Sequence, residues 1–495
     1  MSDATADGAP AGPYAAALMR PPAPGPVARA VTRFMAVHAS PLPLPLTAGV
    51  LGVGVTVAVL VVGHRPGLGL ALAVPLMWVP AVPALVRRRA WSVLLTASLA
   101  VALGAVAAVR DAEWVVALSL LAAFALSAVA AAGARSPLGL ALAVPTVPIA
   151  ATRGVRWFAR GLSAIVAGGR AEALRWVRTA ALTLVILGVF AVLLASADAV
   201  FATLLPSLDL RSLPAQILVG AFAVMAALAI ASLAQRRPPW SVVRMPRPEP
   251  RRRVEWYLPV LALDALMLAF LLTQVVAAAG GDRYVRQVIG LSYAAYARQG
   301  FGQLVAVTAL TLAVVAWFAR RAPRAERSDR IGTRAALGVL CVSALGIVAT
   351  ALFRMSLYVQ AYGLTELRLL ATAGEIVMGA AVVLVLVAGV RWRARWLPLA
   401  VVRVAGVAML ALALLNPDAL MVRYNTQAQD APLDAWHLEH LSADAVPAIA
   451  ALDDPLRSCL LRGYSVPAAT SIWEWNHARA QARAVDDVTN RTSCR

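Results

Sequence analysis

Residues 112–133 read AEWVVALSLLAAFALSAVAAAG and contain a single charged side chain, Glu113. A transmembrane helix needs about 20 mostly apolar residues to cross the hydrocarbon core of a bilayer. No proline interrupts this stretch, and the nearest arginines, Arg110 and Arg135, lie just outside it. The stretch therefore predicts a membrane-spanning helix.

The composition of the whole chain agrees with this prediction. Its 495 residues are 61% hydrophobic and only 14% charged, and the mean hydropathy is +0.74. Soluble domains are about half apolar and a quarter charged, so a water-soluble fold could not bury this much apolar surface. We expect an all-α polytopic membrane protein.

Runs similar to 112–133 recur along the chain and predict about eleven transmembrane helices. The second run contains Pro75, Pro80 and Pro83, which predict a kinked or re-entrant segment. The predicted helices cover roughly residues 45–63, 68–86, 90–109, 112–133, 179–202, 214–234, 255–278, 300–319, 335–357, 367–390 and 396–415.

The formal net charge is +20, and all 45 basic residues are arginine. Arginine-rich loops, such as those that begin at Arg87, Arg135 and Arg236, alternate with arginine-poor ones. Cytoplasmic loops carry the excess of positive charge, so the N-terminus is expected in the cytoplasm and the C-terminus outside it. The arginines are expected to contact anionic lipids, and nucleic acid is not needed to explain them.

The use of arginine alone, with abundant alanine, valine and leucine, is typical of a GC-rich bacterial genome. The predicted location is therefore the bacterial cytoplasmic membrane. The chain divides into a disordered cytoplasmic N-terminus (1–44), four transmembrane helices (45–133), a basic amphipathic cytoplasmic segment (134–178), a core of about seven helices (179–416) and an extracytoplasmic tail (417–495). In the third segment Trp157, Phe158, Leu162 and Ile165 recur at helical spacing, which favours an anchor on the membrane surface over a partner-docking helix.

Four charged residues fall inside predicted transmembrane helices: Asp264, Arg354, Glu375 and Arg403. Such residues are rare, usually paired and candidates for functional sites. Their depths, from a rise of about 1.5 Å per residue, predict a pair of Asp264 with Arg403 and a pair of Arg354 with Glu375. These pairs either neutralise charge and hold helix register or form a proton or ion relay.

Three polar, aromatic-rich segments lie at the predicted outer ends of later helices. They read YARQGFGQL (296–304), AYGLTELRL (361–369) and NPDALMVRYN (416–425). The predicted topology places all three on one face. This outer cluster contains Tyr296, Arg298, Gln299, Tyr362, Arg368, Asp418, Arg423 and Asn425.

These segments resemble signature segments of a bacterial polytopic family known as domain of unknown function 4173. LSADAVPAIAAL (441–452) and WEWNHARA (473–480) in the tail are also similar to that family, so the resemblance covers roughly residues 180–480. The resemblance implies an all-helical, multi-pass fold and carries no established activity.

Two interpretations of the outer cluster remain open. Tyrosine, arginine and asparagine at helix ends can anchor and cap helices. Alternatively, the arginines and tyrosines converge on an anionic group, such as a lipid phosphate or a glycan carboxylate, because guanidinium binds such groups in a bidentate way.

The tail contains two of the three cysteines, Cys459 and Cys494, and a disulfide between them is expected if the tail lies in an oxidising compartment. His437 and His440 are spaced to share one helix face, next to Glu439, but no further ligand lies at a spacing typical of a metal site. The two histidines are therefore interpreted as surface residues, and no metal is predicted. No phosphate loop, nucleophile elbow or dinucleotide fingerprint is present, and neither a catalytic residue nor a cofactor is predicted.

The leading prediction is a binding or signalling component of the cell envelope with its site on the extracytoplasmic face. One alternative is a secondary transporter that uses Asp264 or Glu375 in coupling. Another is a membrane enzyme that acts on lipid-linked envelope material. The oligomeric state is not predicted.

Overall fold

The computed structural model describes residues 42–87, 89–167, 170–198, 211–241, 252–289, 300–323, 326–392, 394–427, 433–462 and 464–486, together with residues 32, 34, 36 and 201. Every regular element in this part of the chain is a helix. Eleven of the helices are long and apolar enough to cross a membrane, which confirms the predicted all-α polytopic fold. The predicted disordered N-terminus lies almost entirely outside the described residues.

Each of the eleven predicted runs overlaps one of these helical segments. They are α3 (Leu44–Val61), Leu68–Arg87, α6 (Trp91–Val109), α7 (Glu113–Ala132), α10 (Arg170–Ala197), α12 (Leu213–Gln235), α13 (Arg253–Ile289), α15 (Phe301–Arg321), α16 (Arg327–Tyr362), α17 (Glu366–Arg391) and α18 (Leu397–Leu414).

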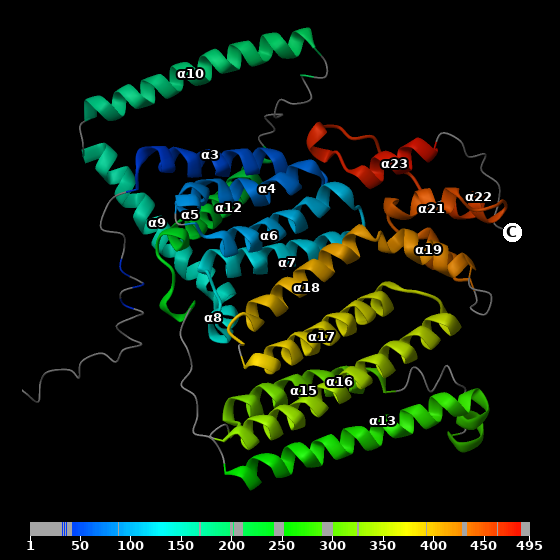
Figure 1. Ribbon diagram of the computed structural model, residues 1–495. Helices are drawn as coiled ribbons and strands as arrows, with labels where there is room; N and C mark the ends of the chain where they lie inside the picture. The colour runs from blue at the N-terminus through cyan, green and yellow to red at the C-terminus, as the bar shows by residue number, and fades with distance from the viewer. Residues whose placement is uncertain are drawn as a thin grey trace, which may run out of the picture.

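The long helices form two packed groups. The first group contains α3, α4, α6, α7 and α12, and the second contains α13, α15, α16 and α17. Helix α18 joins them, because it packs against α6 and α7 on one side and α17 on the other (Figure 1).

The proline-containing segment is continuous and changes helix type along its length. It consists of α4 (Leu68–Trp78), a short 3-10 turn (Val79–Ala81) and α5 (Val82–Arg87), and Pro75 lies inside α4. Proline removes a backbone donor and clashes with the preceding turn, which explains the change in helix type here.

The segment predicted to lie on the membrane surface forms α8 (Pro137–Ala141) and α9 (Ala143–Ala167). Helix α9 packs against α12 and α7, and Trp157 is buried among Val50, Val53 and Leu228. The predicted surface anchor is therefore wrong for Trp157, because this side chain faces protein. Helix α10 lies apart from both groups (Figure 1), and its large apolar side chains between Leu182 and Leu194, where the structure describes them, are exposed.

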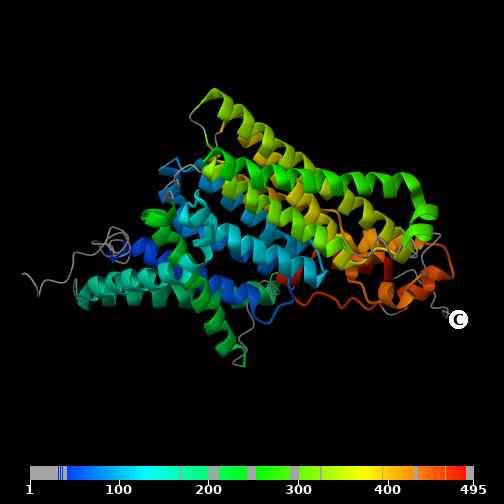
Figure 2. The ribbon, with the colours of Figure 1, turned by 90° about the horizontal axis from the view of Figure 1, so that it is seen from below.

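The tail folds at one end of the bundle (Figure 2). It contains α19 (Pro417–Gln427), α20 (Ala435–Glu439), α21 (Val446–Ala450), α22 (Leu456–Leu461) and α23 (His477–Asp486), with short 3-10 turns at Ala443–Ala445 and Ile472–Glu474. We call this the tail end. The opposite end, where Arg87, Arg135, Arg236, Arg321 and Arg391 lie, is called the arginine-rich end.

Helices α3 and α12 approach each other closely at Gly54. A β-carbon on Gly54 would lie 3.0 Å from the carbonyl oxygen of Gly220 and would collide with a methyl group of Val224. The contact therefore depends on the missing side chain, as is common where transmembrane helices pack through small residues.

Gly54→Ala is expected to destabilise the first group by about 1–3 kcal/mol, because the added methyl group overpacks a contact that includes backbone. Gly52→Ala on the same helix is the matched control, since a β-carbon there meets nothing within 4 Å. Thermal unfolding of the purified protein in detergent measures both. Equal melting temperatures for the two variants would contradict the close contact.

Candidate functional site

The turn between α16 and α17 is held by Asn425 of α19. Its Oδ1 accepts a hydrogen bond from the backbone nitrogen of Leu364 at 2.6 Å, and its Nδ2 donates to the carbonyl oxygen of Leu364 at 2.9 Å. Gly363 has φ +78°, and a β-carbon there would lie 2.8 Å from Asn425 Oδ1. The segment NPDALMVRYN therefore binds the backbone of the segment AYGLTELRL through the side chain of Asn425.

Arg368 caps the end of α16. Its Nη1 donates to the carbonyl oxygen of Tyr362 at 2.8 Å and also to that of Gly363, and its guanidinium lies 4.3 Å from the ring centroid of Tyr358. The last carbonyls of a helix have no partner within it, and a cation near them is favourable. The Tyr362 side chain is 48% exposed.

Asp418 connects α19 to the rest of the tail. Its Oδ2 accepts hydrogen bonds from the backbone nitrogen of Ser442 at 3.0 Å and from the Ser442 hydroxyl at 2.6 Å. Arg423 is exposed. Tyr296, Arg298 and Gln299 lie outside the described residues, so the convergence of the outer cluster on an anion stays a prediction.

The tail segment LSADAVPAIAAL (441–452) binds the loop between α6 and α7. Asp444 is 1% exposed, and its Oδ2 accepts from the backbone nitrogens of Asp111 at 2.6 Å and Ala112 at 2.9 Å. Its Oδ1 pairs with Arg110 at 3.2 Å. Burial raises the pKa of the Asp444 carboxyl, although the hydrogen bonds from Ala112, Asp111 and Arg110 favour its charged form.

The WEWNHARA segment (473–480) also binds the loop between α6 and α7. Asn476 Nδ2 donates to the carbonyl oxygens of Ala107 at 3.0 Å and Arg110 at 2.8 Å. Arg479 pairs with Asp111 at 2.6 Å and also donates to the carbonyl oxygen of Pro66 at 2.7 Å. Sequence reasoning missed this docking, because nothing in the tail indicates which loop it binds.

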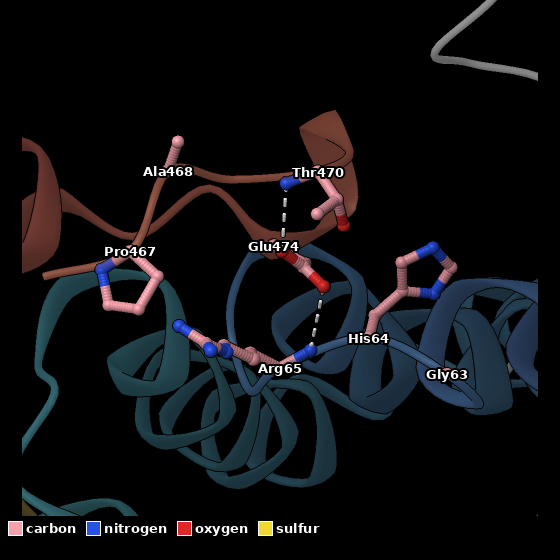
Figure 3. A pocket seen from close by; sticks show the side chains of 7 residues that line it. All are labelled: Gly63, His64, Arg65, Pro467, Ala468, Thr470 and Glu474. Atoms are coloured by element: carbon pink, nitrogen blue, oxygen red, sulfur yellow. Dashed lines mark hydrogen bonds between the residues drawn. The ribbon is translucent and has the colours of Figure 1, made fainter.

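A cavity of about 550 Å³ opens beside this docking surface, between the α3–α4 loop and the tail (Figure 3). It is lined by Gly63, His64, Arg65, Pro467, Ala468, Thr470 and Glu474. We call it the tail cavity. Its volume lies in the range of small-molecule sites, about 300–1,000 Å³.

Glu474 stands in the wall of the tail cavity, between Thr470 and Arg65 (Figure 3). Its oxygens accept from the backbone nitrogens of Thr470 at 3.0 Å and Arg65 at 3.3 Å. Burial raises the pKa of this carboxyl, but the hydrogen bonds from Thr470 and Arg65 together outweigh burial and hold the pKa below its usual value. Glu474 is therefore ionised and already bonded, and Arg65 brings an exposed guanidinium to the same lining.

A comparison with known families identifies the family to which the chain belongs. The model of a domain of unknown function (DUF4153) matches residues 97–452. The chain belongs to the DUF4153 family. No curated protein and no solved structure matches the chain.

The DUF4153 match corrects the resemblance found in the sequence, which indicated a different number among the families of unknown function. It begins within α6, so it includes α7 and the loop at Arg110 that the resemblance did not cover. It also contains Asp444 and ends before WEWNHARA. The protein is a multi-pass membrane protein of unknown activity.

Within the DUF4153 region, the predicted pairing of intramembrane charges is wrong. Arg403 Nε donates to the Thr96 hydroxyl at 3.0 Å, and its Nη2 donates to the carbonyl oxygen of Ser92 at 2.5 Å and to the Ser92 hydroxyl at 2.9 Å. Asp264 belongs to α13, on the far side of the second group (Figure 1).

Arg354 does not pair with Glu375. Its Nη2 donates to Gln274 Oε1 at 2.7 Å, towards the tail end. Glu375 is 0% exposed, and neither of its carboxylate oxygens has a hydrogen-bond partner; the same is true of Asp264 Oδ1. The structure thus places two buried carboxyl groups in the second group of helices without the expected arginines.

In the tail of this DUF4153 protein, Cys459 is disulfide-bonded, and Cys341 in α16 is a free thiol. Cys494, the predicted partner of Cys459, lies outside the described residues. His437 and His440 form part of no group of potential metal ligands among the described residues.

Arg479→Gln is expected to release the tail from the α6–α7 loop, because it removes the ion pair with Asp111 and leaves this carboxylate and two carbonyl oxygens unpaired. Breaking a buried ion pair costs about 3–5 kcal/mol. Arg483→Gln, one turn further along α23, is the control, since Arg483 only donates to the carbonyl oxygen of Pro467. Limited proteolysis should cleave the tail of the first variant faster. Equal cleavage rates would contradict the docking role.

Proposed function

We propose that this protein binds a small anionic molecule at its tail end and is a binding or signalling component of the cell envelope. The tail cavity carries this proposal, because it combines ligand-sized volume with an exposed guanidinium at Arg65 and an imidazole at His64. Guanidinium groups bind carboxylates and phosphates through two parallel hydrogen bonds. Pro467 and Ala468 supply an apolar wall for the rest of the ligand.

Hydrogen bonds between the tail and the α3–α4 loop fix the walls of the tail cavity without a ligand. Leu68 donates from its backbone nitrogen to the carbonyl oxygen of Trp475 at 2.9 Å, and Arg479 ties the carbonyl oxygens of Pro66 and Glu474 together at 2.7 Å each. A site that is already formed costs less conformational entropy on binding. This supports a site between the tail and the α3–α4 loop rather than on the tail alone.

We infer that the arginine-rich end faces the cytoplasm of a bacterial cell and that the tail end lies outside. Short cytoplasmic loops carry the excess of arginine in membrane proteins. The connections at the tail end contribute only Arg65, Arg110, Arg211 and Arg368 among the described residues. Those at the other end contribute Arg87, Arg89, Arg135, Arg236, Arg237, Arg320, Arg321, Arg327, Arg391 and Arg395.

The test uses the full-length protein in detergent with two probes, glycerol 3-phosphate and glucuronate. Isothermal titration should detect binding of at least one of them, and Arg65→Gln should weaken it about tenfold through loss of a charge-assisted hydrogen bond. Arg423→Gln is the control, because Arg423 is an exposed arginine of the outer cluster at the same end.

Weaker binding by Arg423→Gln with unchanged binding by Arg65→Gln would move the site to the outer cluster. Absence of binding by the wild-type protein to both probes would contradict a site for small anions.

A second function, proton-coupled transport, is favoured by the two buried carboxyl groups. Carboxylates are costly in a membrane interior and mark proton pathways by default. Asp264 lies about 16 Å along α13 from Arg253, and Glu375 about 13 Å along α17 from Glu366 at the other end. Both groups therefore lie near mid-depth of the same four helices.

Glu375→Gln and Asp264→Asn are expected to abolish proton uptake into proteoliposomes that contain a pH-sensitive dye and carry an inside-negative potential. Glu366→Gln, at the first residue of α17, is the control and should leave uptake unchanged. Uptake by wild-type proteoliposomes that does not exceed that of protein-free liposomes would exclude this second function.

A further inference from the structure

A small cavity opens at the arginine-rich end, between the first turns of α6, the last turns of α7 and the start of α18. Its polar lining comes from Ser92, Thr96 and Arg135, and Gly133 and Leu399 form part of its wall. The cavity volume is about 10 Å³, which is room for about one water molecule. A larger ligand would therefore sit at the mouth, where Arg135 is exposed.

The charge at this cavity is positive and unbalanced. Arg403 binds Ser92 and Thr96, which are neutral acceptors, and no carboxylate pairs with it in the part of the chain that the structure describes. Arg135 is close enough for its charge to act unfavourably on that of Arg403. Two neighbouring guanidinium groups without a counter-charge favour binding of an anion.

The start of α6 adds to this positive field. The helix begins at Trp91, and the preceding residue, Ala90, supplies no side-chain cap. The backbone nitrogens of Trp91, Val93 and Leu94 donate to the carbonyl oxygens of Arg89 and Ala90, and the positive end of the helix dipole lies at this turn. Ser92, which lines the cavity, belongs to this first turn.

Exposed tryptophans stand at the start of two of the helices that line the cavity. Trp91 is 71% exposed at the start of α6, and Trp396 is 42% exposed at the start of α18. Tryptophan at the ends of transmembrane helices lies at the level of the lipid headgroups. Leu95, one turn further along α6, is 60% exposed and offers an apolar surface to acyl chains.

We propose that this mouth binds the phosphate group of an anionic phospholipid. Arg135 contacts the phosphate oxygens, and Arg403 and the positive end of the α6 dipole supply positive charge from below. The tryptophans favour a lipid phosphate over dissolved phosphate, because they place the mouth at headgroup depth. This site is independent of the tail cavity, which lies at the opposite end of the bundle.

The test uses the full-length protein in a neutral detergent and native mass spectrometry. The probes are dioctanoyl phosphatidylglycerol, dioctanoyl phosphatidylcholine and inorganic phosphate. We expect the wild-type protein to bind phosphatidylglycerol in preference to phosphatidylcholine, and Arg135→Gln to weaken that binding about tenfold. Arg327→Gln is the matched control, because Arg327 is an exposed arginine at the same end, at the start of α16.

Arg135→Gln carries the test because the side chain is exposed, whereas Arg403→Gln also removes contacts that join α18 to α6. Equal phosphatidylglycerol binding by wild type and Arg135→Gln would overturn the proposal, as would equal binding of the two lipids by wild type. Displacement of phosphatidylglycerol by equimolar inorganic phosphate would overturn the lipid as the source of the anion.

Discussion

The buried carboxylate of Asp444 joins segments of this protein that lie more than 300 residues apart in the chain. It accepts two backbone hydrogen bonds from the α6–α7 loop and pairs with Arg110. Arg110 also donates to the carbonyl oxygens of Ala413 at 2.6 Å and Leu414 at 2.7 Å, at the end of α18. A single network thus joins the first group of helices, the connecting helix α18 and the tail.

The charged groups inside the helices differ in their hydrogen bonding according to their depth. Arg403 is bonded to neutral acceptors near a helix end, and Arg354 donates one hydrogen bond to Gln274. Glu375 and Asp264 lie deeper and keep oxygens without partners. Arginine cannot lose its charge, so it needs acceptors, whereas a carboxyl group becomes neutral by taking up a proton. This difference supports the proposed proton binding by the deep carboxyl groups and the proposed lipid contacts of the arginine-rich end.

The helices could be predicted from the sequence because the membrane requirement is local. A run such as 112–133 must form its own backbone hydrogen bonds in hydrocarbon, whatever its neighbours are. The interpretation of the outer cluster as caps was equally local, and Arg368 on the end of α16 agrees with it. The pairs of Asp264 with Arg403 and of Arg354 with Glu375 failed because depth gives the position along a helix and not which helix lies beside it.

The sequence by itself determined the membrane class, the eleven helical segments and the uneven distribution of arginine, since hydropathy and charge act within about 20 residues. Only the tertiary structure decided that α18 meets α6 instead of α13, that the tail docks on the α6–α7 loop, and where the two cavities lie. These features depend on side-chain shape and hydrogen bonds between segments up to about 400 residues apart, such as Arg65 and Glu474. No local pattern encodes such a pairing.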